Sequence, residues 1–275
     1  MILENEIIHG DCFDLMPGVP PESVDLIFTD PPYETALKDI YDWTAGLDWT
    51  KLTAEFGRVL KPSGQVALFC DWTTGQFITT ALRDRFKFRF IWIWQKTCAQ
   101  PVNKKMPLAE VELIAIYSKR KSRLKDLTFN WQAIAGQGKP YYREFNRKNP
   151  TRKLVKPYIS ESNGIRYPRQ ILNFPTKCNM PKDERTSHPC QKPIGLCSYV
   201  IESLSNPGEL ILDPFTGSCS IPIACIRLGR RFIAFERDQK YYAESVERLK
   251  NETTQGDLFQ SNQTLSQKKL STWNK

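Results

Sequence analysis

The alternation of strand-like and helix-like patterns restricts the fold of this chain more than any other feature of its sequence. Six short runs of apolar, β-branched or aromatic residues predict buried strands at 24–29, 65–70, 90–95, 111–117, 210–212 and 231–235. Apolar residues at three- and four-residue steps predict helices over 48–60, 76–85, 194–204, 219–228 and 238–249. This alternation is typical of an α/β fold in which a mainly parallel sheet has helices on both faces.

Positive charge is concentrated in one segment of the chain. The net charge is +9, yet the stretch from Lys119 to Gln170 contains 14 Lys and Arg against 3 Asp and Glu. Aromatic residues lie among these cations: Phe129, Trp131, Tyr141, Tyr142, Phe145, Tyr158 and Tyr167. Cations bind phosphates and rings stack on bases, so the segment predicts a nucleic-acid surface. A solvated basic insertion without a ligand is the alternative.

The cysteines and histidines show no metal-binding pattern. The 8 cysteines include no CxxC pair, and His9 and His188 are the 2 histidines of the chain. We therefore expect no bound metal, and thiols kept reduced in a cytosol. The longest apolar runs fall short of the roughly 20 residues that span a bilayer, and the first residues are acidic, unlike a secretory leader. These features predict a cytoplasmic protein without a membrane partner.

Two predicted strands end in unusual polar turns. One turn is Asp30-Pro31-Pro32-Tyr33, and the other runs from Asp213 to Ser220. In a parallel sheet, ligands bind outside the carboxyl ends of the strands, so these turns are expected to carry the chemistry. Two successive prolines donate no backbone hydrogen bond, which leaves a rigid extended turn with its carbonyls available as acceptors. An ordinary structural turn is the alternative.

The sequence VDLIFTDPPYE around the first turn resembles the catalytic motif of amino-methyltransferases that act on DNA bases. The resemblance implies that Asp30, Pro31, Pro32 and Tyr33 are the catalytic residues, and that a target base leaves the duplex and stacks on Tyr33. It also implies that the Asp30 carboxylate and the Pro31 carbonyl accept the hydrogens of the base's amino group. Asp at position 30 favours adenine N6 over cytosine N4, and the methyl donor would be S-adenosylmethionine.

The second turn lies within LILDPFTGSCSIPIACIRLGRRFIAFERD, which reads as a nucleoside-binding βαβ unit. It lacks the GxGxxG of nicotinamide dehydrogenases and resembles the family's DPFxGSG motif, from which Cys219 and Ser220 depart. Gly217 would allow close approach of the ligand, and Glu236 would accept the ribose hydroxyls. A positive φ at Cys219 would disfavour binding, and its place at a helix start leaves that question open.

Further segments match the same family. His9-Gly10-Asp11-Cys12 and His188-Pro189-Cys190-Gln191-Lys192-Pro193 resemble its cofactor-bordering segments, while Trp94-Gln95-Lys96 and a later strand with Glu110 are taken as support for the fold. The expected cofactor-binding residues are Asp11, Cys12, Asp30, His188, Lys192, Asp213, Phe215, Thr216, Gly217, Ser218 and Glu236.

The order of the motifs implies a domain organisation. The catalytic motif precedes the cofactor motif, as in the β group of this family, which implies a circularly permuted Rossmann-like methyltransferase fold. We expect residues 1–118 and 170–250 to form the catalytic domain, 119–169 an inserted target-recognition region, and 251–275 a polar, flexible tail. The expected DNA-binding residues are Lys119, Arg120, Lys121, Arg123, Lys139, Arg143, Arg147, Lys148, Arg152 and Lys153.

The expected function is therefore site-specific methylation of adenine N6 in double-stranded DNA, by a bacterial or phage-encoded enzyme. The sequence leaves open a homodimer and a cognate restriction nuclease. Other readings are a cytosine-N4 methyltransferase, an enzyme acting on RNA or on a protein glutamine, and a non-catalytic DNA-binding module. The basic segment argues against a glutamine substrate, and the intact motifs argue against a non-catalytic module.

Overall fold

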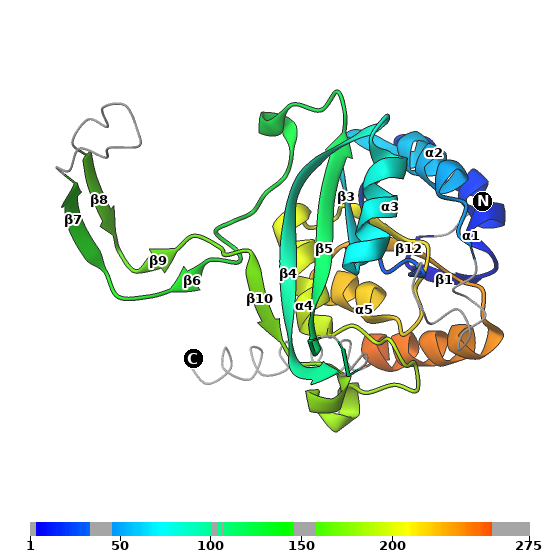
Figure 1. Cartoon of the computed structure of the whole chain (residues 1–275). Coiled ribbons are helices and arrows are strands. Elements are labelled where there is room, and N and C mark those ends of the chain that lie inside the picture. The colour runs from blue at the N-terminus through cyan, green and yellow to red at the C-terminus, as the bar shows by residue number, and fades with distance from the viewer. Residues whose placement is uncertain (1–3, 34–45, 101–103, 106, 146–157, 255–275) are drawn as a thin grey trace, which may run out of the picture.

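The centre of the molecule is an eight-stranded sheet. The computed structural model describes residues 4–33, 46–100, 104–105, 107–145 and 158–254. The strands of the sheet are β1 (Glu6–His9), β2 (Val24–Thr29), β3 (Leu60–Cys70), β4 (Phe86–Gln100), β5 (Ala109–Lys119), β10 (Ile171–Phe174), β11 (Leu210–Asp213) and β12 (Arg231–Glu236). They are arranged in the order β1-β12-β11-β2-β3-β5-β4-β10 (Figure 1).

The sheet is mainly parallel, as predicted. β5 runs antiparallel to both of its neighbours, β3 and β4, whereas the other described pairings in the sheet are parallel. β2 and β11 are neighbours, so the two unusual turns leave the sheet side by side at its carboxyl edge. The sequence prediction omitted β1 and β10, which are the two edge strands and contain four residues each, too few for a clear pattern.

Helices cover both faces of the sheet. They are α1 (Cys12–Leu15), α2 (Trp49–Val59), α3 (Trp72–Leu82), α4 (Ile194–Leu204), α5 (Ser220–Arg227) and a last helix over 239–254, with 3-10 turns η1 (Met16–Gly18), η3 (Leu124–Asp126), η4 (Lys177–Asn179) and η5 (Lys182–Glu184). Alternate residues of β2 point to opposite faces, so Ile27 joins the core beneath α2 and α3, while Leu26 and Phe28 join the core beneath α4 and α5.

Two helices differ from their predicted bounds for local reasons. α3 begins at Trp72, four residues before its predicted start, because Asp71 caps it by accepting a hydrogen bond of 2.7 Å from the Thr74 amide. The last helix continues through 254, where Arg227 pairs with Glu252 at 2.7 Å. Residues 251–254 are therefore helical, in contrast to the predicted tail, and the rest of the predicted tail, 255–275, lies outside the described residues.

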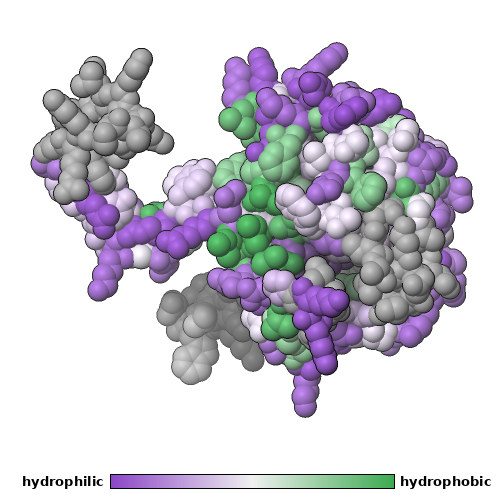
Figure 2. Space-filling view, in the orientation of Figure 1, coloured by the Kyte–Doolittle hydropathy of each residue, from purple (hydrophilic) through white to green (hydrophobic). Residues whose placement is uncertain are grey.

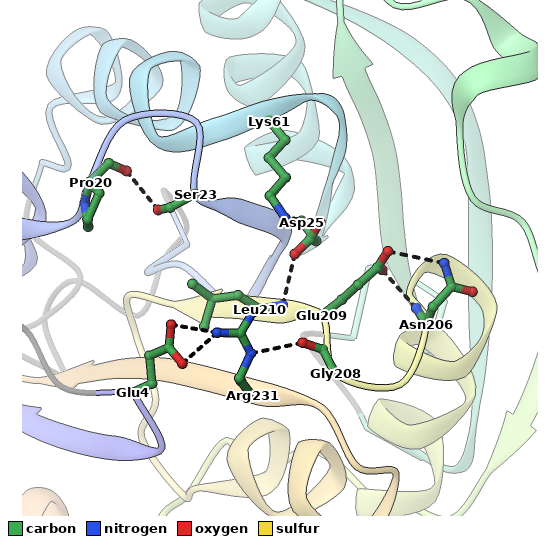
Figure 3. A network of polar contacts seen from close by, with 10 residues as sticks. All are labelled: Glu4, Pro20, Ser23, Asp25, Lys61, Asn206, Gly208, Glu209, Leu210 and Arg231. Carbon is green, nitrogen blue, oxygen red and sulfur yellow. Dashed lines mark hydrogen bonds and ion pairs between the residues drawn. The ribbon is translucent and has the colours of Figure 1, made fainter.

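Polar contacts connect the amino ends of the central strands, at the edge of the sheet opposite to that of the two turns (Figure 3). Asp25 at the start of β2 accepts from the Lys61 ammonium at 2.7 Å and from the Leu210 amide at 2.9 Å, which joins β2 to β3 and β11. Arg231 at the start of β12 pairs with Glu4 at 2.6 Å. These contacts fix the stagger of the strands, and therefore the positions at which their carboxyl ends meet.

An arm projects from the edge of the sheet next to β10 (Figure 1). Its described residues, 136–145 and 158–166, form two antiparallel pairs: β6 (Gly136–Gln137) with β9 (Ile165–Arg166), and β7 (Tyr141–Phe145) with β8 (Tyr158–Ser162). Hydrophilic side chains cover much of its surface in the view of Figure 2. The arm is the part of the predicted insertion that stands away from the body of the protein.

The first part of the predicted insertion packs on the body instead. The Gln65 side chain donates to the Thr128 carbonyl at 2.7 Å, and the Asn130 amide donates to the Ser203 carbonyl at 2.8 Å. The Phe129 ring packs against Trp92, with ring centroids 6.4 Å apart. Phe129 therefore belongs to the core packing and is not an exposed ring available to a base.

Three general predictions can be compared with the described residues. No helix among them is long and apolar enough to cross a membrane. No group of three or more His, Cys, Asp or Glu side chains in that part of the chain is placed to hold a metal ion. The cysteines all lie within it, and each carries a free thiol.

Candidate active site

A cavity of about 1000 Å³ opens at the carboxyl edge of the sheet. Its walls come from the two unusual turns, the ends of β1 and β12, β4 and β5, and the segment that leads into α4. The structure thus brings together residues that the sequence placed far apart: Asp11, Cys12, Asp30, Pro31, Pro32, Tyr33, His188, Lys192, Phe215, Thr216, Gly217, Ser218 and Glu236. Asp213, the last residue of β11 and the first of the second turn, is buried.

The catalytic turn is held by its neighbours. Thr29, the last residue of β2, donates to the Asp213 carboxylate at 2.6 Å and so ties the first turn to the second. Asp30 points one oxygen, Oδ2, at the Lys192 ammonium at 2.6 Å, and its other oxygen, Oδ1, is buried without a hydrogen-bond partner among the described residues. An unpartnered buried carboxylate oxygen is costly, so this atom marks a position where a donor is expected to bind.

A cluster of buried charges lies behind the turn. Lys192 is 8% exposed and bridges Asp30 to Glu112, whose Oε1 lies 2.8 Å from its ammonium. Lys96 pairs with the other Glu112 oxygen at 2.8 Å, and the Tyr33 hydroxyl donates to Glu112 at 2.5 Å. Two ammonium and two carboxylate groups therefore compensate one another, as buried charges require.

The two carboxylates of this cluster have opposite pKa shifts. Burial opposes ionisation of Glu112, but the ammonium groups of Lys192 and Lys96 outweigh it and lower its pKa to about 2. Burial raises the pKa of Asp30 above its usual value, and the negative Glu112 adds to this effect while Lys192 opposes it. Glu112 is therefore ionised near neutral pH, whereas the protonated form of Asp30 is the one that burial favours.

The second turn forms a cradle at the other side of the cavity. Glu236 at the end of β12 accepts from the Gly217 amide and from the Asp238 amide, each at 2.8 Å. Gly217 has a φ of +52°, and a Cβ there would lie 3.0 Å from Nε2 of His188. Burial lowers the pKa of His188 to about 4, with Lys192 and Lys177 adding to the effect, so its imidazole is neutral near pH 7. Gly217 thus lies between the fixed carboxylate of Glu236 and the neutral ring of His188, where a larger residue would fit only with a shift of the ring or the backbone.

The residue that departs from the family motif also departs from usual backbone geometry. Cys219 caps the amino end of α5 with a φ of +65°, in the left-handed region, and its side chain is fully buried. Cys219 has a positive φ although it lies at the start of a helix, because it is the last residue before α5 and the chain turns there. The side chain points into the core beneath α5, so the strain leaves the cavity lining itself unobstructed.

Asp11 and Cys12 follow β1, a strand that the sequence prediction omitted. Asp11 caps α1 by accepting from the Phe13 amide at 2.9 Å, and its second oxygen lies 3.9 Å from Arg237. Burial raises the pKa of the Cys12 thiol to about 12, with the Asp11 carboxylate adding to the effect. Both residues line the cavity on the side of Glu236.

Two residues of the site were missed as functional residues. Lys96 was expected to support the fold only, and Glu112 was not singled out, because Glu110 was the glutamate named in that strand. Glu110 is exposed, whereas Glu112 is 5% exposed and lies opposite Trp94 in the β4–β5 pairing. Both glutamates are on the same face of β5, so alternation alone does not separate them. A charged residue in an otherwise apolar strand was the available signal.

The predicted DNA-binding residues divide into three groups. Lys119 is the last residue of β5, and Arg120 and Lys121 follow it, at the edge of the sheet opposite the cavity. There Lys119 lies 3.5 Å from Glu22, and Arg120 donates to the Arg83 carbonyl. Arg123 is nearby and pairs with Asp126 at 2.7 Å. Lys139 and Arg143 are exposed on the arm. The other four, Arg147, Lys148, Arg152 and Lys153, lie outside the described residues.

The sheet, the order of its motifs and the polar cavity define a methyltransferase of the S-adenosylmethionine-dependent class. The chain belongs to the family of DNA methylases that modify N6 or N4 amino groups, whose family model matches residues 24–247. It is 32% identical over 254 residues to the DNA adenine methyltransferase YhdJ of Escherichia coli (strain K12), covering 88% of this chain and 82% of that protein. It is 26% identical over 279 residues to the type II methyltransferase M.HinfI of Haemophilus influenzae, covering 90% and 68%.

Solved structures agree on the fold. The M1.HpyAVI–SAM complex superposes with a TM-score of 0.60 at 25% identity, covering 88% of this chain and 98% of that one. The cytosine-N4-specific PvuII DNA methyltransferase superposes with a TM-score of 0.62 at 17% identity, which shows the fold alone, and covers 92% of both chains. This chain is thus a DNA methyltransferase with a Rossmann-like fold, and its cofactor is S-adenosylmethionine.

The residues of the cavity fit this cofactor. The Glu236 carboxylate is held rigidly by two backbone amides and retains further lone pairs for hydroxyl groups of a ribose. Gly217 has no Cβ, so its backbone lines the cavity directly, beside the ring of His188. The cavity continues from this cradle to Asp30, so a cofactor and a base can lie next to each other.

Proposed function

We propose that this enzyme transfers the methyl group of S-adenosylmethionine to N6 of an adenine flipped out of duplex DNA. The observation that carries the proposal is that Asp30 lines the cavity together with Tyr33 and that its Oδ1 has no hydrogen-bond partner among the described residues. An exocyclic amino group supplies the hydrogen that this atom lacks. Asp at this position and the 32% identity to a protein named as an adenine methyltransferase support adenine over cytosine.

The residues of the turn have separate tasks in this mechanism. S-adenosylmethionine, when bound, supplies a methyl group attached to a sulfonium. Asp30 accepts one hydrogen of the amino group, and the backbone of Pro31 lines the same part of the cavity. This contact orients the nitrogen lone pair, which is otherwise delocalised into the ring, and alignment of this kind accounts for a large part of such rate enhancements. The raised pKa of Asp30 suits it to take the proton that the amino group loses.

Tyr33 is proposed as the stacking surface for the base. Its hydroxyl is held by Glu112, so the direction of the side chain is set before a base arrives. Extruding a base costs a few kcal/mol, and stacking on an aromatic ring recovers about 1–3 kcal/mol. A ring that is already oriented avoids an additional entropic cost.

The arm is proposed to contact the DNA backbone. Arg143 and Arg166 both lie against the Tyr141 ring, at 5.1 Å and 4.9 Å from its centroid, and Arg166 also donates to the Lys139 carbonyl. These contacts keep the cations in place on an exposed arm. A row of cations that projects from the enzyme is suited to phosphates, which position the duplex without reading its sequence.

Product analysis tests the proposed target. The enzyme is incubated with labelled S-adenosylmethionine and mixed duplex DNA, and the DNA is digested to nucleosides. We expect the label in N6-methyladenine, and label in N4-methylcytosine would overturn the adenine assignment. The Asp30→Asn variant tests the site in the same assay. It should lower kcat by about 100-fold or more, as for the loss of a proton acceptor, while cofactor binding measured by calorimetry is retained.

A further inference from the structure

We propose that Glu112 is a positioning residue that sets both the orientation and the acidity of Asp30 through Lys192. In this arrangement Lys96 compensates part of the negative charge of Glu112. This inference rests on the proposed role of Asp30. Glu112 does not contact the second turn, where the cofactor is expected, and three of its contacts lead toward the reacting end of the cavity: Tyr33, Lys192 and Lys96.

The contacts of Glu112 define a relay to Asp30. Its Oε1 receives both the Tyr33 hydroxyl at 2.5 Å and the Lys192 ammonium at 2.8 Å, and the same ammonium reaches Asp30 at 2.6 Å. Glu112 therefore fixes two members of the catalytic turn from one oxygen atom. Because Lys192 is almost fully buried between the two carboxylates, a change of charge at Glu112 must change how strongly Lys192 holds Asp30.

Lys96 keeps this arrangement in balance. It occupies the second oxygen of Glu112 at 2.8 Å and lies two residues beyond Trp94, which is opposite Glu112 in the β4–β5 pairing. Without Lys96, Glu112 would draw more strongly on Lys192 and leave Asp30 less well compensated. Lys96 thus compensates the charge of Glu112, so that Lys192 remains available to compensate Asp30.

The wider surroundings of Asp30 contain few other charges. The titratable groups that face it from the neighbouring elements are Tyr33 in its own turn, Cys70 at the end of β3, Lys96 on β4, Glu112 on β5, Cys190 and Lys192 before α4, Cys197 on α4, and Asp213 at the end of β11. Among these, Glu112 and Lys96 can be changed without altering a residue that is proposed to touch the base or the cofactor.

Two variants with opposite expected effects test the relay. Activity requires the Asp30 carboxylate, so kcat is expected to fall as the pH drops through the pKa of Asp30. Glu112→Gln removes a negative charge, so the acid limb of the kcat–pH profile should move to lower pH. Its kcat should also fall by roughly 100-fold, as small misplacements of reacting groups do. Lys96→Met removes a positive charge, so the acid limb should move to higher pH.

The controls separate positioning from structural damage. Glu112→Asp restores the charge at a shorter reach and should recover the wild-type acid limb and part of kcat, while Glu110→Gln, on the same strand but exposed, should match the wild type. The affinity for S-adenosylmethionine should remain within about twofold in the Glu112 and Lys96 variants. Acid limbs that stay in place, or that move in the same direction in both variants, would overturn the relay.

Asp30→Asn, measured alongside, distinguishes this inference from the proposed function. If Asp30→Asn retains its kcat, the proposed role of Asp30 is wrong. If Asp30→Asn is inactive while the Glu112 and Lys96 variants keep the wild-type profile, only the relay is wrong. Should Glu112→Gln not fold, the Lys96→Met profile alone decides, because a shift to higher pH supports the relay and an unchanged limb overturns it.

Discussion

Replacement of Lys192 by Met is expected to make the stability of the enzyme depend on pH. In the wild type, Lys192 compensates Asp30 and is shared with Glu112, which keeps Lys96 as a second partner. The substitution leaves a methionine of similar length and removes the one ammonium within hydrogen-bond distance of Asp30 in the described structure. Asp30 then has to be protonated in the folded state, because an isolated buried carboxylate is too costly.

The loss of stability in Lys192→Met can be calculated from the pKa that Asp30 has in the unfolded chain. An Asp in an unfolded chain has a pKa of about 3.9, and each pH unit above it costs about 1.36 kcal/mol to keep the group protonated. Protonation of Asp30 therefore costs about 4 kcal/mol at pH 7 and about 1.5 kcal/mol at pH 5. The value at pH 7 agrees with the range of about 3–5 kcal/mol for removing one partner of a buried ion pair.

The sign is opposite to that of an ordinary ion-paired carboxylate. Above pH 4 the folded variant binds one proton more than its unfolded state, so its free energy of unfolding falls as the pH rises. The loss continues until the raised pKa of Asp30 in the folded variant is reached. Domains of this kind have a total stability of about 5–15 kcal/mol, so the variant is expected to remain folded and measurable.

Urea unfolding at pH 5 and pH 7 provides the measurement. The difference in free energy of unfolding between wild type and Lys192→Met should be larger at pH 7 by roughly 2–3 kcal/mol. Lys182→Met, at an exposed lysine in the same segment, is the matched control and should show little change at either pH. A destabilisation by Lys192→Met that is the same at both pH values would refute the reasoning, since Asp30 would then stay ionised and solvated.

Three further predictions concern the cofactor, the chemistry and the DNA. Gly217→Ala should weaken S-adenosylmethionine binding about tenfold in calorimetry, a change of about 1.4 kcal/mol, because its Cβ would lie 3.0 Å from His188 and one of the two has to shift at the cavity. Gly208→Ala, at a φ of +80°, has the same left-handed backbone strain of about 1–2 kcal/mol but open space around it, so it should lower stability and leave affinity unchanged. The acid limb of the kcat–pH profile should reflect the protonation of Asp30, whose pKa is raised, so activity is lost as the pH falls through that pKa. An acid limb that is the same in Glu112→Gln and Lys96→Met as in the wild type would contradict this assignment. The double variant Lys139→Ala with Arg143→Ala should reduce the slope of log Kd against log salt by about 2, and an unchanged slope would mean that the arm does not contact phosphates. Replacement of Lys119, Arg120 and Lys121 by Ala, measured in the same way, tests whether the opposite edge of the sheet also contacts them.

The sequence by itself determined the type of sheet and the residues at its carboxyl edge. Periodicity is local, so the six predicted strands were found, and β2 was placed at its observed bounds, Val24–Thr29. The turns at Asp30 and Asp213 directly follow strands, and parallel strands bring their ends to one edge whatever lies between them in the chain. Motif order then gave the family and its cofactor without knowledge of any contact.

The tertiary structure alone decided which charges meet at the site. Glu110 and Glu112 share one face of β5, and only the pairing of β5 with β4 places Glu112 beside Lys96 and carries Glu110 beyond the buried part of the site. Lys192 was assigned to the cofactor from its motif, whereas its ammonium lies between Asp30 and Glu112. The physical reason is that strand register and the approach of the loop before α4 depend on the whole packed core, which no local pattern of residues specifies.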